Sequence, residues 1–128
     1  MTFGTTNNQI VRATLESICY QIVAVLDAMK EDLGSSIDTV AMNGGLSKNK
    51  FIQQGLNNLI SATIEMQNSQ DISALGAAML AGLQIKMYDS LLEIKSLLQK
   101  ELLEKEPSST SITNKFQTWK NIIQTNTI

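Results

Sequence analysis

In Val40-Ala41-Met42-Asn43-Gly44-Gly45-Leu46-Ser47-Lys48-Asn49 an apolar segment runs into two glycines and a helical pattern follows, and this order indicates a strand, a turn and a helix. Glycine has no Cβ, so the backbone can turn sharply at Gly44 and Gly45, and a planar molecule can lie flat against it. Most glycine pairs between a strand and a helix are only turns. A ligand site at this turn is therefore a hypothesis that the rest of the chain has to support.

The composition describes one domain at most. The chain has 128 residues, of which 43% are hydrophobic, enough for an ordinary core. Ten basic residues against twelve acidic ones do not make the basic surface that nucleic acid or an anionic membrane requires. No continuous apolar run has the length of a membrane span, and the N-terminus lacks the pattern of a signal peptide. We therefore expect a cytoplasmic protein with neither nucleic acid nor membrane as a partner.

Two residue counts exclude whole classes of sites. Cys19 is the only cysteine and the chain has no histidine. An intrachain disulfide, a thiolate or imidazole metal site, and nucleophilic chemistry that pairs serine or cysteine with histidine are therefore excluded. Cys19 lies in an apolar run, which predicts a buried and inert thiol. We predict no catalytic and no metal-binding residue in this chain.

The apolar spacing of the first two thirds of the chain predicts an α/β fold. A capping box at Thr6–Gln9 opens a helix whose apolar residues repeat at spacings of four and three as far as Leu33. Residues 37–42 and 62–66 are expected to be strands, and Ser47 is expected to cap the helix between them. This order predicts two parallel strands joined by a right-handed crossover. Two strands are too few for a stable parallel sheet, so part of the sheet is expected to lie elsewhere.

The last third of the chain is expected to be helical. Asp71 or Ser73 can cap a helix over residues 74–82, and the many small residues of that helix predict very close packing against a neighbour. A second capping box at Ser90 opens a helix expected to end before Pro107. A polar linker over residues 107–113 then leads to a final helix, in which Phe116 and Trp119 are spaced to pack back on the body.

Four segments together resemble the FGGY carbohydrate kinases. They are QIVRATLESICYQ, VAMNGGLSKNKFIQQ, DISALGAAMLAGL and FQTWKNII, and they occur in the order that the last part of the family has them. Within the family, the resemblance is greatest to the members that phosphorylate glycerol. It implies a partial ribonuclease H-like lobe of the actin and hexokinase type, with two parallel strands and C-terminal helices. Residues 1–88 would be the later half of the nucleotide-binding lobe, and residues 89–128 a helical extension.

The resemblance also implies a nucleotide site. In the family the Gly-Gly turn lies against the adenosine of ATP, and an asparagine in the opening turn of the next helix contacts the nucleotide. These nucleotide-binding roles fall on Gly44, Gly45 and Asn49. Free N–H groups at a helix N-terminus would suit such a ligand. The chain departs from the family at Asn43, where an acid is usual, and at Gln9, where a histidine is usual; a usual proline is also absent from residues 67–70.

The resemblance places the phosphate loop, the catalytic base and the polyol-binding residues upstream of this segment. ATP and magnesium would be cofactors of the complete kinase, and ATP or ADP and glycerol or a similar polyol its ligands. We predict a C-terminal, nucleotide-side fragment of an ATP-dependent polyol kinase that phosphorylates nothing alone, because phosphoryl transfer needs all these groups in position. A truncated, non-catalytic interaction module, a kinase for another sugar, and a homo-oligomer stay open.

Overall fold

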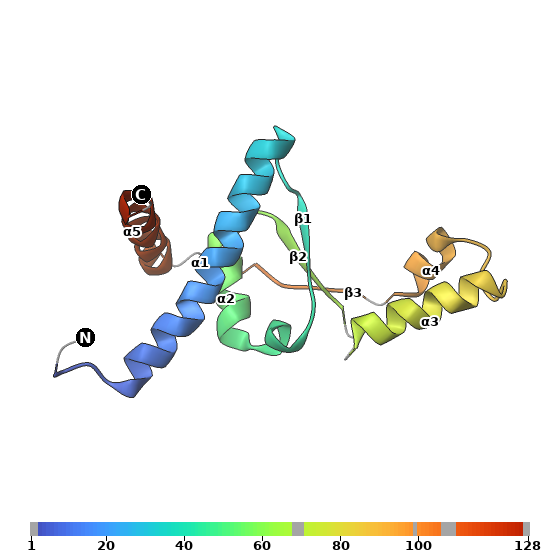
Figure 1. Cartoon of the computed structure of the whole chain (residues 1–128), viewed down its shortest axis with the longest axis horizontal. Coiled ribbons are helices and arrows are strands. Elements are labelled where there is room, and N and C mark those ends of the chain that lie inside the picture. Colours follow the sequence, from blue (N-terminus) through green and yellow to red (C-terminus); the bar gives the residue numbers. More distant parts are fainter. Residues whose placement is uncertain (1–2, 68–70, 99, 106–109, 127–128) are drawn as a thin grey trace.

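The computed structural model describes residues 3–67, 71–98, 100–105 and 110–126. Figure 1 shows a body of α1, α2, the sheet and α5, from which α3 and α4 extend to one side as a helical hairpin. The elements in chain order are α1 (Asn7–Leu33), β1 (Thr39–Met42), the 3-10 turn η1 (Gly45–Lys48), α2 (Lys50–Leu59), β2 (Thr63–Gln67), α3 (Ile72–Gln84), α4 (Leu91–Leu97), β3 (Lys100–Leu102) and α5 (Thr110–Asn126).

The first helix begins and ends where the sequence predicts. The Thr6 hydroxyl oxygen accepts a hydrogen bond from the Gln9 backbone N–H, and the Gln9 side-chain oxygen accepts one from the Thr6 backbone N–H at 2.8 Å. Gly34 ends α1 in the left-handed conformation, at φ 63°. Both predicted helix ends are thus confirmed, and α1 runs for 27 residues.

By length and composition α1 could also cross a membrane. Core helices of water-soluble proteins pass the same test. The inner face of α1 contributes Cys19, Tyr20 and Val23 to the apolar core, each at most 5% exposed. We interpret α1 as a core helix.

The sheet contains the predicted parallel pair and one strand that the sequence analysis missed. β1 and β2 run parallel, with Val40 opposite Ile64, and β1 lies at one edge of the sheet. β3 pairs with β2 in the antiparallel sense, with Glu101 opposite Met66. The predicted parallel pair is therefore confirmed, and within the described residues the sheet also has a third strand that was not predicted, in the order β1-β2-β3.

The missed strand replaces part of a predicted helix. The helix opened at Ser90 was expected to continue almost to Pro107, but α4 ends at Leu97. Beyond it the chain is extended, and the Leu103 N–H donates to the Ile64 carbonyl at 2.9 Å. Leu103 packs against the core while Leu102 is 60% exposed, which is the alternation of a strand and not of a helix.

The apolar core lies between α1, α2, the sheet and α5. α1 and α2 approach closely at Gly55, because a Cβ built on that residue would lie 2.7 Å from the Cys19 sulfur. Only glycine at residue 55 lets α1 and α2 approach this closely. The buried apolar residues of this core are Cys19, Tyr20, Val23, Ile52, Leu56, Ile60, Ala62, Ile64 and Phe116.

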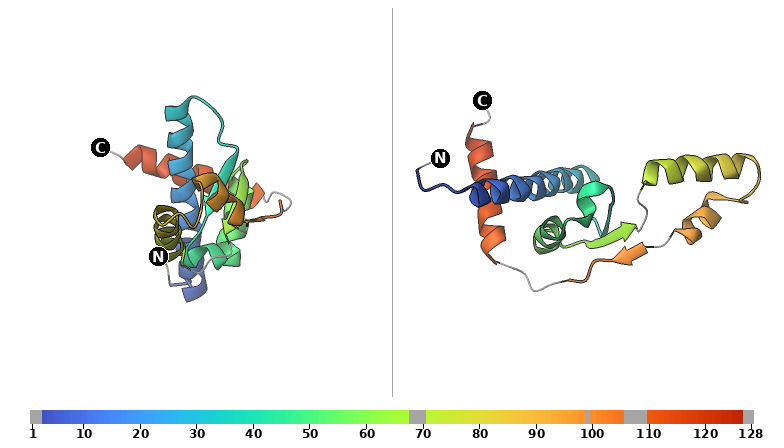
Figure 2. Two further views of the ribbon diagram at one scale, coloured as in Figure 1. Left: turned by 90° about the vertical axis from the view of Figure 1, so that its right-hand side faces the viewer. Right: turned by 90° about the horizontal axis from the view of Figure 1, so that it is seen from below.

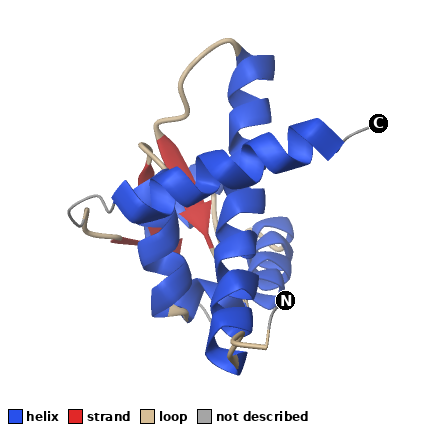
Figure 3. Cartoon of the chain, turned by 90° about the vertical axis from the view of Figure 1, so that its left-hand side faces the viewer, coloured by secondary structure: helices blue, strands red, loops and turns tan. Residues whose placement is uncertain are grey.

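The last helix packs back on the body, as predicted. Figure 3 shows α5 crossing α1. The Tyr20 ring lies 5.6 Å from the Phe116 ring and 5.7 Å from the Trp119 ring, centroid to centroid. Lys115 of α5 forms an ion pair with Glu16 of α1 at 3.0 Å. The expected linker falls partly on residues 106–109, which lie outside the described residues; α5 begins at Thr110.

The prediction of close packing for the small-residue helix is wrong within the described chain. Asp71 caps α3 by accepting a hydrogen bond from the Ala74 N–H at 2.9 Å, so Asp71 and not Ser73 is the cap. A Cβ built on Gly76 would meet no atom within 4 Å. The one tight glycine of α3 is Gly82, where a Cβ would lie 2.7 Å from the ring of Tyr88. The small residues of α3 otherwise face open space.

Candidate functional site

The predicted glycine turn follows directly on the carboxyl end of β1. In open α/β sheets, ligands bind beyond the carboxyl ends of the parallel strands, so the turn lies at the expected edge of this sheet. Gly44 has φ 93° and ψ −179°, a conformation that side chains with a Cβ rarely adopt. Gly45 has no positive φ and opens η1. The backbone itself therefore requires glycine at residue 44 but not at residue 45.

The space beside the turn is open. A Cβ built on Gly44 or on Gly45 would meet no atom of the described residues within 4 Å. A side chain at residue 45 would therefore fit this chain without a clash, and it would fill a space that the chain itself does not use. This surface can receive a flat group such as a nucleotide base.

Asn49, and not Ser47, caps the helix that follows. The Asn49 Oδ1 accepts hydrogen bonds from the N–H groups of Phe51 at 2.9 Å and Ile52 at 3.3 Å. The prediction that Ser47 is the cap is wrong because η1 comes first and moves the start of α2 to Lys50. Two N–H groups of the first turn of α2 are thus already satisfied, and are not free for a ligand as the sequence analysis expected.

This cap fixes the orientation of the Asn49 amide. Because its oxygen accepts from the helix, its NH2 group lies on the other side of the amide carbon. The residue is half-buried, so the side chain still reaches the surface. Asn49 can therefore donate a hydrogen bond to an acceptor atom of a ligand, such as a ring nitrogen or a ribose oxygen, while it caps α2.

Ser47 and Gln53 hold the turn in place from the inside. The buried Ser47 hydroxyl donates to the Gly44 carbonyl at 2.7 Å. The Gln53 Nε2 donates to the Ser47 carbonyl at 2.6 Å, and the Gln53 side chain is buried. The sequence analysis missed Gln53; the signal available was a polar residue beside the apolar stripe of α2. These bonds make the turn a preorganised surface.

The charged groups next to the turn are two lysines. Lys48 and Lys50 flank Asn49 and are exposed, so the surface beside the turn is positively charged. Among the described residues, no group of three or more acidic or cysteine side chains could hold a metal ion. Burial raises the pKa of the Cys19 thiol to about 11, so Cys19 is inert as predicted and does not belong to the site.

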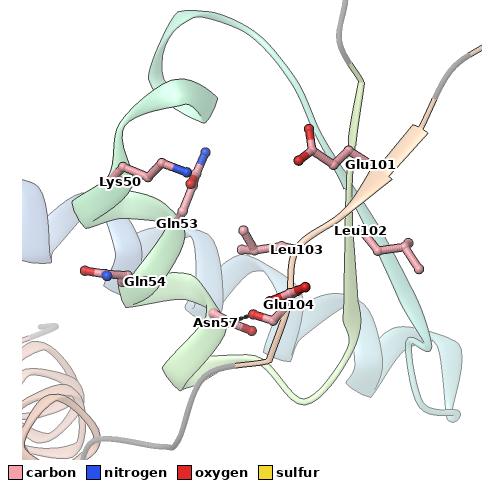
Figure 4. A pocket seen from close by; sticks show the side chains of 8 residues that line it. All are labelled: Lys50, Gln53, Gln54, Asn57, Glu101, Leu102, Leu103 and Glu104. Carbon is pink, nitrogen blue, oxygen red and sulfur yellow. Dashed lines mark hydrogen bonds between the residues drawn. The ribbon is translucent and has the colours of Figure 1, made fainter.

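A cleft of about 420 Å³ lies on another side of α2 (Figure 4). The Asn57 side chain donates to the Glu104 carbonyl at 2.6 Å and bridges its two walls. None of the three predicted nucleotide-binding residues lines it, although Lys50, next to Asn49, and Gln53, which supports the turn, both do. Its lining residues are Lys50, Gln53, Gln54, Asn57, Glu101, Leu102, Leu103 and Glu104.

Known proteins similar to this chain point to one family. The sequence profile of the FGGY family of carbohydrate kinases, C-terminal domain, matches residues 1–85. The chain is 38% identical over 127 residues to a glycerol kinase of Photorhabdus laumondii, which covers 96% of this chain. It is 35% identical over 128 residues to a glycerol kinase of Psychromonas ingrahamii, which covers 97% of this chain. In each case the chain covers 25% of the relative.

A solved structure agrees with the sequence relatives. The crystal structure of Plasmodium falciparum glycerol kinase with ADP matches 100% of this chain with a TM-score of 0.78 and 32% sequence identity. The match covers 26% of that protein. This chain therefore spans about a quarter of the length of the relatives that it matches.

Proposed function

The chain belongs to the FGGY family of carbohydrate kinases, and on this premise we propose that it forms the nucleotide side of an ATP-dependent polyol kinase. The resemblance predicted from four sequence segments is confirmed by the family profile and by the glycerol kinase relatives. Glycerol is the proposed acceptor in the complete enzyme, because these relatives are glycerol kinases. A cytoplasmic location is part of the proposal.

The observation that carries the proposal is an unexplained glycine. Gly45 has neither a positive φ nor a neighbouring atom that a Cβ would touch. Nothing in the described part of the chain therefore requires glycine at residue 45. A ligand that lies flat against the turn supplies the missing reason, since it would occupy the space of the side chain.

The proposed roles in nucleotide binding follow from this geometry. Gly44 and Gly45 form the surface against which the adenosine lies, and the Asn49 NH2 group donates to it. Lys48 and Lys50 add positive charge near a ligand that carries phosphates. ATP supplies the phosphoryl group in the complete kinase, where Mg²⁺ accompanies its phosphates.

The groups for the chemical step are proposed to lie outside this segment. No residue of this chain is assigned as the base for the acceptor hydroxyl, and a nucleotide surface without such a base does not transfer a phosphoryl group. The isolated chain should therefore show no ATP-dependent phosphorylation of glycerol above background.

A chimera tests this function. In it, the C-terminal quarter of the Photorhabdus laumondii glycerol kinase that matches this chain is replaced by the chain itself. We expect the chimera to phosphorylate glycerol in an ATP-dependent reaction, with the isolated chain as the inactive control. A chimera that melts cooperatively but has no such activity would contradict the proposal, and so would activity of the isolated chain.

A further inference from the structure

Two buried amide side chains lie one turn apart on α2. Gln53 is 4% exposed and Asn57 is 6% exposed. Figure 4 shows both side chains leaving the same helix. A buried amide costs free energy unless its groups are hydrogen-bonded, so the partner of each amide indicates what that residue does for the fold or for the site.

The Gln53 amide connects the glycine turn to the sheet. Its Nε2 lies 2.6 Å from the Ser47 carbonyl oxygen, to which it donates, and 3.5 Å from the Met66 sulfur. Met66 belongs to β2 and lies opposite Met42, the last residue of β1. Gln53 therefore holds the turn against the carboxyl ends of both parallel strands, the edge at which open α/β sheets bind ligands.

Ser47 lies between the residues proposed to bind the nucleotide. Its hydroxyl and its backbone N–H both donate to the Gly44 carbonyl, at 2.7 and 3.1 Å. On its other side the Asn49 N–H donates to the Leu46 carbonyl at 3.0 Å. Ser47 is 6% exposed, so water has little access to it and cannot readily replace the Gln53 amide.

Asn57 makes a matching hydrogen bond at a different place. Its side chain donates to the Glu104 carbonyl, also at 2.6 Å, beyond the end of β3. Gln53 and Asn57 thus share the helix, the donor group, the burial and the bond length. They differ in the backbone that they hold, because only Gln53 holds the glycine turn.

We infer that Gln53 is a positioning residue for ATP, which acts through the turn by holding Gly44, Gly45 and Asn49 in the arrangement that receives the nucleotide. The inference rests on the proposed function, because that proposal assigns ATP to this turn. A turn that adopts the binding arrangement for only part of the time binds its ligand with an affinity reduced by that fraction. Loss of the Gln53 hydrogen bond should therefore weaken ATP binding and leave the chemical step unchanged.

The test is Gln53→Met in the chimera, with Asn57→Leu as the matched control. Each substitution removes a buried donor with little change in side-chain size. Gln53→Met should raise the Michaelis constant for ATP about fivefold, while kcat and the constant for glycerol change less than about twofold. Asn57→Leu should also lower the melting temperature, but it should leave all three kinetic constants within about twofold.

A milder variant covers the case in which Gln53→Met does not fold. Gln53→Asn keeps the amide but shortens the side chain by one methylene, so the donor no longer reaches the Ser47 carbonyl. It should raise the constant for ATP in the same direction. An unchanged constant for ATP in the Gln53 variants would overturn the inference, and so would an equal rise from Asn57→Leu, because lost stability alone would then be the cause.

Two further comparisons separate this inference from the proposed function. If Gly45→Val raises the constant for ATP and the Gln53 variants do not, the positioning role fails while the nucleotide site stands. If the chimera is inactive, the proposed function fails, and hydrogen exchange of the isolated chain decides whether Gln53 orders the turn. Gln53→Met should speed exchange of the Ser47 and Asn49 N–H groups and Asn57→Leu should not. Unchanged exchange, or equally faster exchange in both variants, would overturn the role of Gln53.

Discussion

The body and the hairpin are both built from apolar helices, yet they bury those side chains to opposite extents. Ile52 and Leu56 of α2 are 1% and 2% exposed, whereas Leu80 of α3 is 61% exposed and Ile85 at its end is 70% exposed. α2 packs against α1 and the sheet within the chain, while α3 projects from them (Figure 2). Apolar periodicity thus predicts that a face will be buried, but the partner that buries it need not lie in the same segment.

The largest expected difference between the two regions comes from truncating an isoleucine in each. Ile52→Ala should lower the free energy of unfolding by about 2–5 kcal/mol, because it opens a cavity in the core. Ile85→Ala should change it by less than about 0.5 kcal/mol, because the side chain is exposed. Urea unfolding of the isolated chain measures both. Similar losses would mean that the hairpin is part of the core.

Replacing a glycine by alanine should change the stability in opposite directions in the two regions. Gly55→Ala should destabilise the chain by about 1–3 kcal/mol, because the new methyl group would meet the Cys19 sulfur at 2.7 Å. Gly76→Ala should instead stabilise it by about 0.4–1 kcal/mol, since the space is open and alanine favours a helix.

A double mutant provides a control for the Gly55→Ala prediction. Combining Gly55→Ala with Cys19→Ala should cost less than the sum of the two single changes, because the smaller side chain leaves room for the methyl group. An additive double mutant, or a destabilising Gly76→Ala, would show that the described packing of these helices is wrong.

Much of the body could be predicted from the sequence because its signals are local. The capping box at Thr6, the parallel pair of strands and the aromatic anchors Phe116 and Trp119 all follow from spacing and cap residues. β3 could not be predicted, because residues 100–102 lie in a leucine-rich stretch that suits a helix. Their extended form is fixed by pairing with β2, which is remote in sequence.

The residues of the candidate site could be predicted from the sequence, but the hydrogen bonds that hold the turn in place could not. Residue type alone indicated the turn at Gly44 and Gly45, and the family resemblance added Asn49. The capping role of Asn49 was missed because a 3-10 turn precedes α2, and such a turn leaves no clear period in the sequence. Gln53 was missed because its partners, Ser47 and Met66, come together only in the folded chain.

Two glycines with positive φ distinguish a loss of stability alone from a loss that also affects the site. Gly34 and Gly44 both have positive φ and open space for a Cβ. Alanine at either should cost about 1 kcal/mol of stability, because both conformations disfavour a Cβ. In the chimera, only Gly44→Ala should also raise the Michaelis constant for ATP. Equal ATP constants for the two variants would remove residue 44 from the nucleotide surface.

The smallest expected effect is the loss of stability at low pH that comes from the ion pairs of Glu16 between α1 and α5. Burial raises the pKa of Glu16, but hydrogen bonds and charge from Arg12 and Lys115 outweigh it and hold the pKa below its ordinary value of 4.5. A lowered pKa stabilises the fold above pH 4.5, and this contribution is lost as the pH falls through and below that value. Because Arg12 and Lys115 are exposed, its size should not exceed about 1 kcal/mol.

Replacing the carboxylate tests this contribution. The Glu16→Gln variant should be less stable than the unchanged chain above pH 4.5. This difference in stability should become smaller as the pH is lowered below 4.5, and thermal melting of both proteins over that range measures it. Parallel pH profiles of the two proteins would show that the Glu16 ion pairs do not stabilise the packing of α5 on α1.

The most direct test of the nucleotide site is the effect of Gly45→Val on the two Michaelis constants of the chimera. A Cβ at residue 45 meets no atom of the described residues within 4 Å, and the backbone there has no positive φ, so the substitution should leave folding intact and occupy the space assigned to the adenosine. We predict that the constant for ATP rises about tenfold or more while that for glycerol changes less than about twofold. An unchanged constant for ATP, or an equal rise for both substrates, would contradict the assignment of Gly45 to the nucleotide site.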